Sequence, residues 1–431
     1  MLSAWPAGDR KSYTRWRESR VLQPQRPAQY RDPVLFSIRE LFPAMLKAQA
    51  TFKAREMLSA DFSGSAPAPF VGRAGYPYVN VGILSPPRIE PRAWEYDAPR
   101  LWSRDSYDIS RIVQLRSELV NSRFLADVRL LRGRFLDASQ EVAMASRPVE
   151  MEFHLHERPV ARLSLSPEAA PTGPAAALKA LEITSNPHVP RRIESAVSDT
   201  DLKAEAAVRT LFSKGVDEGK LTRLLSVGTL GVKAQRKLVP TRWSITAVDD
   251  IAGKALIREA KDCQLLGEHL LFIGEYLGNR FHVMLLPEVW GYELFETFLP
   301  TLSMLESPDV KYTTDHEGYD GRSAYAENCA GGYYAARLAV LERLGAMKRQ
   351  ARVVVLRVIS EEYALPLGVW VVREAVRKAM RSEPRRFSSR EEMLEEVRQS
   401  VSAAYHVDAL YFFRRSRLLA EARTQRRLLE Y

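Results

Sequence analysis

The densest group of residues able to do chemistry lies in RKLVPTRWSITAVDD, residues 236–250. If the centre of this segment is extended, Arg242, Ser244 and Thr246 point to one face of a strand. A guanidinium and two hydroxyl groups on that face could bind a phosphate group. The alternative is a strand end, with an aspartate that caps a helix at 251–260 and Arg242 paired to a carboxylate. Periodicity alone favours this structural interpretation.

Carboxylates gather at two places in the chain. The first is the pair Asp249-Asp250, and the second is TDHEGYDGRSAYAENCAGGYYAARLAVLE, residues 314–342. Within eight residues the second cluster contains Asp315, His316, Glu317, Asp320 and Arg322. Paired carboxylates could bind a divalent metal ion, and a Gly-rich helix start could bind phosphate, whereas the alternative is a polar surface loop. The catalytic candidates are Asp249, Asp250, Asp315 and Glu317.

The two clusters are expected to form one site. Each cluster mixes arginine with carboxylates, and each adjoins a predicted helix start. A single buried cleft would explain why so many charges occur in otherwise apolar segments.

A third candidate segment is Gly- and Pro-rich. The pattern of residues 61–87 predicts short strands joined by tight turns. Backbone amides and Arg73 could face a phosphate there, although a structural turn is the preferred interpretation. The phosphate- or nucleotide-binding candidates are therefore Arg73, Thr241, Arg242, Ser244 and Arg322.

Zinc is not expected. Cys263 and Cys329 are isolated, with no CxxC spacing, and His154 and His156 have no third ligand nearby. No P-loop, GxSxG, HExxH or kinase motif occurs in the chain.

The elements that must position these residues are both helical and extended. Short or apolar runs predict strands at 150–159, at 269–300 with a turn at Gly278-Asn279, and at 352–359. Residues 107–178 otherwise look mainly helical, with a surface loop at 166–174. Further helices are predicted at 35–58, interrupted at Pro43, and at 191–235, 333–348, 369–381 and 389–405. We expect a mixed α/β or α+β fold with one large core built from two regions.

Composition and charge limit the classes of protein to which this chain can belong. The chain has 431 residues, of which 46% are hydrophobic and 27% charged, so wholesale disorder is excluded. No apolar run reaches the roughly 18 residues that span a bilayer, and no signal peptide is recognisable, so we expect a cytoplasmic, nucleoid-associated protein without membrane contact. The net charge of +10 lies largely at the ends, in a basic arm at 1–33 and a tail at 411–431. This excess predicts weak, salt-sensitive and sequence-independent DNA binding.

Four segments resemble a known family. Residues 70–82, 224–250, 316–342 and 361–379 are similar, in order, to the signature blocks of the archaeal Nre DNA-repair family, NreA type. The resemblance implies a role in DNA damage repair and contact with the sliding clamp PCNA. It suggests an N-terminal family region at 34–300 and a C-terminal one at 301–410. Many members carry an N-terminal cysteine cluster, which this chain lacks, so no zinc site is carried over.

The last residues, TQRRLLEY, contain the Q-x-x-L-x-x-aromatic spacing of a PCNA-interacting peptide. Gln425 would hydrogen-bond the clamp, while Leu428 and Tyr431 would form a hydrophobic plug. The alternative is an amphipathic terminal helix that packs on its own domain.

The sequence leaves three candidate functions open. The first is a repair factor that PCNA recruits to DNA. The second is a metal-dependent nuclease or nucleotide-processing phosphohydrolase, with a site built from residues 241–250 and 315–322. The third is a scaffold that bridges the clamp to a repair nuclease.

Overall fold

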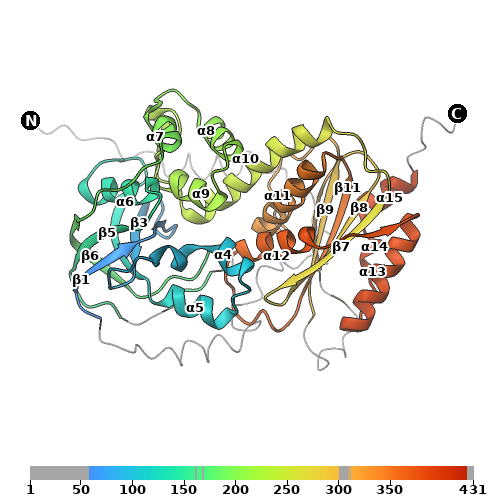
Figure 1. The fold of residues 1–431 in the computed structure, drawn as a ribbon, viewed down its shortest axis with the longest axis horizontal. Helices are drawn as coiled ribbons and strands as arrows, with labels where there is room; N and C mark the ends of the chain where they lie inside the picture. The colour runs from blue at the N-terminus through green and yellow to red at the C-terminus, as the bar shows by residue number, and fades with distance from the viewer. Residues whose placement is uncertain (1–57, 161–162, 167–168, 300–309, 311, 425–431) are drawn as a thin grey trace, which may run out of the picture.

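The computed structural model describes residues 58–160, 163–166, 169–299, 310 and 312–424. Two six-stranded sheets lie toward opposite ends of the molecule, and the long helix α10 (Thr241–Lys261) runs from one half to the other (Figure 1). The mixed α/β class expected from the sequence is confirmed. The expected N-terminal arm, the predicted helices at 35–58 and the motif Gln425–Tyr431 lie outside the described residues.

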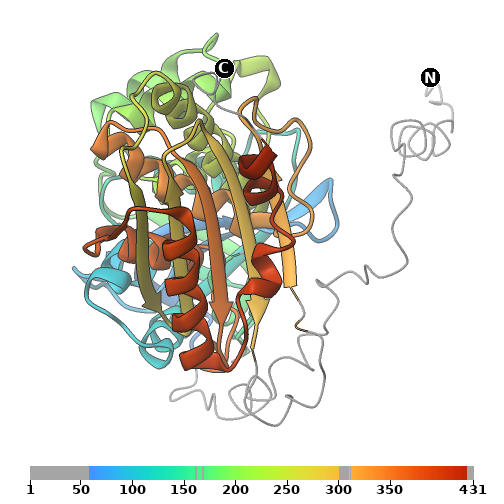
Figure 2. The same cartoon turned by 90° about the vertical axis from the view of Figure 1, so that its right-hand side faces the viewer.

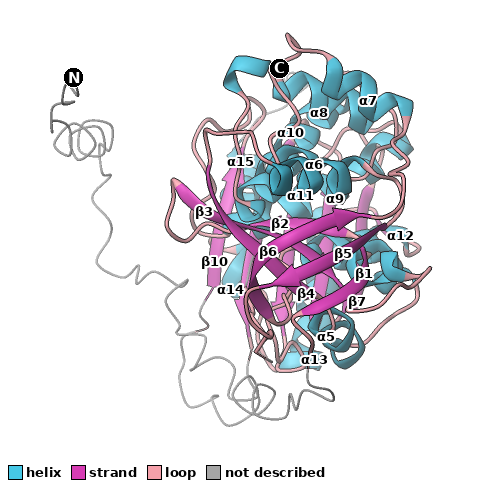
Figure 3. Ribbon diagram, turned by 90° about the vertical axis from the view of Figure 1, so that its left-hand side faces the viewer, coloured by secondary structure: helices cyan, strands magenta, loops and turns pink. Residues whose placement is uncertain are grey.

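The N-terminal sheet is mainly antiparallel, with one parallel contact between β4 and β6 (Figure 3). Its strand order is β1 (Asp61–Ala66), β5 (Val149–Leu155), β6 (Ala175–Ile183), β4 (Val120–Asp127), β3 (Tyr78–Ser85) and β2 (Ala68–Val71). The helical elements in this part are η2 (Ala93–Asp97), α4 (Pro99–Arg104), α5 (Ile109–Ser117) and α6 (Arg134–Met144).

The expectation that 107–178 is mainly helical was wrong, because β4 and β6 both begin within it. The sequence of β6, AAALKALEI, consists largely of good helix formers. It is nevertheless extended, because β5 and β4 pair with it on both sides and tertiary pairing overrides local preference.

A helical layer joins the two sheets. It comprises α7 (Arg191–Ser198), α8 (Ala204–Ser213), α9 (Glu218–Ser226), the short η3 (Lys233–Gln235) and the first part of α10. The extended conformation considered for residues 243–248 is wrong, since they form the first turns of α10. Ser244, Val248 and Ala252 are buried at intervals of four residues, which is the period of a helix face.

The C-terminal sheet contains the predicted hairpin of β7 (His269–Tyr276) and β8 (Asn279–Leu286), joined at Leu277-Gly278. The predicted strand at 352–359 is also confirmed as β11 (Arg352–Ile359), which lies between β8 and β9. The remaining strands are β9 (Gly291–Phe298), β10 (Tyr312–Glu317) and β12 (Arg385–Phe387). Because β8 and β9 precede residue 300 and β11 follows it, the sheet combines chain from both expected regions.

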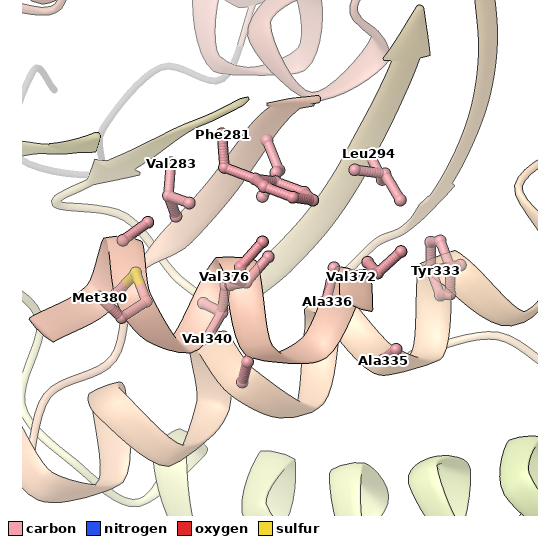
Figure 4. Close-up of a cluster of buried hydrophobic side chains, with 14 of the residues drawn as sticks. Phe281, Val283, Leu294, Tyr333, Ala335, Ala336, Val340, Val372, Val376 and Met380 are labelled. Carbon is pink, nitrogen blue, oxygen red and sulfur yellow. The ribbon is translucent and has the colours of Figure 1, made fainter. Parts of the chain in front are cut away.

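Helices cover both faces of this sheet (Figures 1 and 2). On one face lie α11 (Ala330–Met347) and α12 (Trp370–Arg381), and on the other α13 (Arg390–Tyr405), α14 (Leu410–Phe413) and α15 (Arg417–Thr424). Of these, α11, α12 and α13 match the helices predicted at 333–348, 369–381 and 389–405. The first interface packs Phe281 and Leu294 of the sheet against Val340, Val372 and Val376 of α11 and α12 (Figure 4).

Among the described residues, no helix is both long and apolar enough to cross a membrane.

Candidate functional site

The two aspartates of the first cluster lie on α10, and both are bound by basic side chains. Asp249 is 1% exposed and accepts a hydrogen bond of 2.5 Å from Arg373 of α12. Asp250 accepts one of 2.6 Å from Arg337 of α11, and Lys254 lies 2.6 Å from its other carboxylate oxygen. Each carboxylate therefore ties α10 to another helix.

Arg337 also reaches the second cluster. Its guanidinium is 1% exposed and donates a hydrogen bond of 2.7 Å to Glu317 at the end of β10. Burial opposes the charge of Arg337, yet Glu317 and Asp250 raise the pKa of its guanidinium above the ordinary value. The expected meeting of the two clusters is therefore found, and an arginine lies at the point where they meet.

Asp315 and Arg322 form a separate pair within the second cluster. Their closest atoms are 3.1 Å apart, and Asp315 also accepts backbone hydrogen bonds from Asn328 at 2.9 Å and Cys329 at 2.8 Å. The carboxylate thus fixes the loop that leads into α11, and Arg322 neutralises it.

The buried charges continue through Glu218 of α9. Its carboxylate lies 2.8 Å from Arg377, 3.6 Å from Arg373 and 2.5 Å from Arg100. Burial alone would raise the pKa of Glu218, but the charges of Arg377 and Arg373 hold it well below its ordinary value. We call the set Glu218, Asp249, Asp250, Glu317, Arg337, Arg373 and Arg377 the buried charge network.

The ion pairs of this network hold neighbouring helices together. Each of the four catalytic candidates has one carboxylate oxygen within 3.1 Å of a guanidinium group, while the second oxygens of Asp249 and Glu317 are buried with no hydrogen-bond partner among the described residues. Among the described residues, no group of three or more His, Cys, Asp or Glu side chains is arranged to hold a metal ion. His154 instead contacts Asp61 at 2.7 Å, and both cysteines are free.

The hydroxyl groups proposed for phosphate binding are used inside the protein. Ser244 is fully buried and accepts a hydrogen bond of 3.1 Å from Ser226, which also contacts Thr241 at 3.2 Å. Thr241 accepts a second bond, of 2.9 Å, from the backbone of Val71. These hydroxyls join the start of α10 to β2 and to the end of α9.

Of the remaining phosphate candidates, Arg73 is exposed in the β2–β3 loop and Arg242 is partly exposed at the start of α10. Beside them lie two residues that sequence reasoning missed. The ring centroids of Tyr76 and Trp243 are 5.3 Å apart, and both residues are exposed to solvent. Tyr76 lies in a Gly- and Pro-containing loop and Trp243 in the first turn of α10, and neither setting reveals exposure from the sequence.

Glu293 of β9 was also missed. Its carboxylate is 1% exposed, accepts a hydrogen bond of 2.5 Å from Ser416, and caps the start of α15 by accepting from the backbone of Arg417 and Leu418. The C-terminal helix is therefore fixed to β9, immediately before the motif that starts at Gln425 in the sequence.

Two family models match most of the chain. Residues 37–303 match the model of the N-terminal region of archaeal Nre proteins, and residues 317–431 match that of the C-terminal region. No solved structure matches.

Three curated relatives are similar over most of their length. The chain is 38% identical to DNA repair protein NreA of Haloferax volcanii over 75% of this chain and 78% of the relative. It is 35% identical to DNA repair protein NreB of Archaeoglobus fulgidus over 86% and 92%, and 37% identical to NreA of the same organism over 77% and 82%.

Proposed function

The chain belongs to the archaeal Nre family, and from this we propose that it is a DNA-repair factor recruited to DNA through the sliding clamp PCNA. The relatives named above are DNA repair proteins. The element that would contact the clamp is the C-terminal motif Gln425, Leu428 and Tyr431.

The anchoring of α15 is the observation that most supports this proposal. Glu293 caps the helix, and Leu418 and Leu419 are buried against the sheet. The described part of the helix runs to Thr424, and Gln425 is the next residue in the sequence. A peptide that follows a fixed helix directly loses less freedom on binding than one at the end of a long linker.

Positive charge near the C-terminus would assist the encounter between the protein and the clamp. Arg414, Arg415 and Arg417 are exposed where α14 passes into α15. Exposed cations beside a docking peptide steer it toward an acidic surface and mainly raise the association rate.

The test measures binding to PCNA by calorimetry for the full chain, for a chain ending at Arg423, and for Leu428→Ala with Tyr431→Ala. Loss of two hydrophobic anchors is expected to weaken binding by at least about tenfold, because such anchors dominate peptide affinity. Glu430→Ala, between the two anchors, is the matched control and should bind like the wild type. Undiminished binding by the truncated chain would remove the tail from the interface.

The ion-paired state of the carboxylates favours a binding role over the nuclease or phosphohydrolase alternative. We propose that Asp249, Asp250, Asp315 and Glu317 hold helices and loops in place. In this scheme the clamp brings the protein to damaged DNA, where the protein also bridges the clamp to a repair nuclease.

A further inference from the structure

We propose that a continuous surface formed by residues 72–80, 123–134 and 228–243 binds single-stranded DNA. Exposed aromatic rings would stack on unpaired bases, and arginine and lysine side chains would contact the phosphates. We call this region the basic–aromatic surface. The inference rests on the proposed role in DNA repair but not on the clamp-binding tail.

Backbone hydrogen bonds make the three segments one surface. The amide of Val128 donates to Pro77 at 3.0 Å, and the amide of Leu238 donates to Val128 at 2.8 Å. Residues 128 and 129 therefore lie between the β2–β3 loop and the segment before α10. The contact between Tyr76 and Trp243 closes the group on its other side.

The charge of this surface is strongly one-sided. The three segments contain nine Lys or Arg residues and a single acid, Asp127, whereas the whole chain has 63 basic against 53 acidic residues. Arg73, Arg129, Arg132 and Arg134 are exposed and form no salt bridge with any other residue that the structure describes. Elsewhere in the protein arginines are mostly engaged by carboxylates, so these four are available to a polyanion.

Three aromatic rings stand within this charged region. Tyr76 is 43% exposed, Trp243 45% and Tyr78 56%, although side chains of this size are usually mostly buried. Tyr76 and Trp243 support each other, which limits the freedom that either ring would lose on stacking with a base.

A groove continues the surface beyond Tyr78. It has a volume of about 490 Å³ and lies between β4, β6 and the start of α6. Leu125 and Leu130 give it apolar walls, while Arg132, Arg134 and Lys179 supply positive charge. Tyr78 pairs with Asp127 in the β3–β4 ladder, and Asp127 lines the groove, so the rings and the groove are adjacent.

These features fit single strands better than a duplex. In a duplex the base faces are already stacked, so exposed rings gain nothing from them, whereas unpaired bases present both faces. The surface consists mainly of turns and strand residues and contains no more α-helix than the first residues of α6 and α10, so the binding is expected to be independent of base sequence.

The experiment uses the full chain and fluorescence anisotropy with a labelled oligothymidine and a duplex of equal length, between 50 and 200 mM salt. We expect the single strand to bind several-fold more tightly than the duplex, with affinity that falls steeply as salt rises. Equal affinity for the duplex would overturn the proposal.

Two substitutions of Trp243 distinguish a role of its ring in stacking on bases from a role in packing within the protein. Trp243→Phe keeps an aromatic face and should bind nearly as well as the wild type, whereas Trp243→Leu should bind about tenfold more weakly with an unchanged salt dependence. Arg73→Gln with Arg132→Gln should weaken binding and also reduce the salt slope, because two phosphate contacts are lost.

Tyr325→Leu, an exposed aromatic residue outside this surface, is the matched control and should bind like the wild type. Clamp binding is measured on every variant. Wild-type DNA binding by Trp243→Leu would overturn this inference while leaving clamp recruitment intact. Undiminished clamp binding after tail truncation, together with single-strand binding that Trp243→Leu weakens, would do the reverse.

Discussion

Arg337 links parts of the chain that are far apart in sequence. One guanidinium donates to Asp250 of α10 and to Glu317 of β10, so it holds both predicted clusters against α11. A buried charge of this kind is stable only while its partners remain, since each ion has lost its hydration.

Arg337→Met is expected to destabilise the protein by about 3–5 kcal/mol, because it leaves the buried carboxylate of Glu317 without a cation and Asp250 with Lys254 alone. Urea unfolding followed by circular dichroism measures the change. Adding Glu317→Gln to this variant should restore part of the loss. Arg398→Met on α13, which removes exposed ion pairs with Asp408 and Glu395, should cost less than about 1 kcal/mol. Equal losses at the two sites would contradict a structural role for the network.

Sequence reasoning found three members of this network, the carboxylates Asp249, Asp250 and Glu317. The carboxylates stood out because they cluster along the chain, and their convergence was expected from their shared surroundings. Their partners Arg337 and Arg373 did not stand out, because each is one arginine in an ordinary helix. Which carboxylate each arginine meets depends on how α10, α11 and α12 pack, and no local pattern encodes that.

At the scale of elements, α12 packs unusually closely on β7. A Cβ atom placed on Gly274 would lie 2.5 Å from the Cα atom of Ala379, closer than real carbon contacts come. The small residue in the strand therefore sets the distance between the helix and the sheet.

Gly274→Ala is expected to lower stability by about 1–3 kcal/mol, because either the helix or the strand must move. The matched control is Gly345→Ala in α11, where an added Cβ meets nothing within 4 Å. That change should stabilise by up to about 1 kcal/mol through helix propensity. Thermal unfolding of the two variants should move in opposite directions, and a shared direction would refute the packing argument.

The elements differ in how well local pattern predicted them. RVVVLRVI at 352–359 was predicted as a buried strand because β-branched residues form an uninterrupted apolar run. TRWSITAV at 241–248 carries similar β-branched residues, yet it is helical because its buried positions recur every four residues against α9 and α11. β6 was missed because its alanine and leucine residues favour a helix locally, whereas pairing with the neighbouring strands makes the segment extended.

At the scale of the whole molecule, the C-terminal sheet cannot be completed by either half of the chain. β11 pairs antiparallel with β8 and parallel with β9, so it fills the space between two strands that are consecutive in sequence. Val355, for example, lies between Val283 and Leu294.

A chain ending at residue 303 is therefore expected to aggregate, because β8 and β9 keep unpaired edges and an uncovered apolar face. Co-expression with residues 304–431 should recover a complex that co-purifies. Size-exclusion chromatography of the fragment, alone and with its complement, checks this. A monomeric fragment that unfolds cooperatively by itself would contradict the requirement for β11.

The position of β11 also bears on how this family can evolve. Recombination that exchanges one of the two matched regions, 37–303 or 317–431, for a foreign segment would deprive a central strand of both of its neighbours. The two regions must then be inherited as one unit, unlike domains that are shuffled between genes. Accepted substitutions on β11 should be accompanied by compensating substitutions on β8 and β9, so that correlated change among descendants crosses the boundary between the two regions.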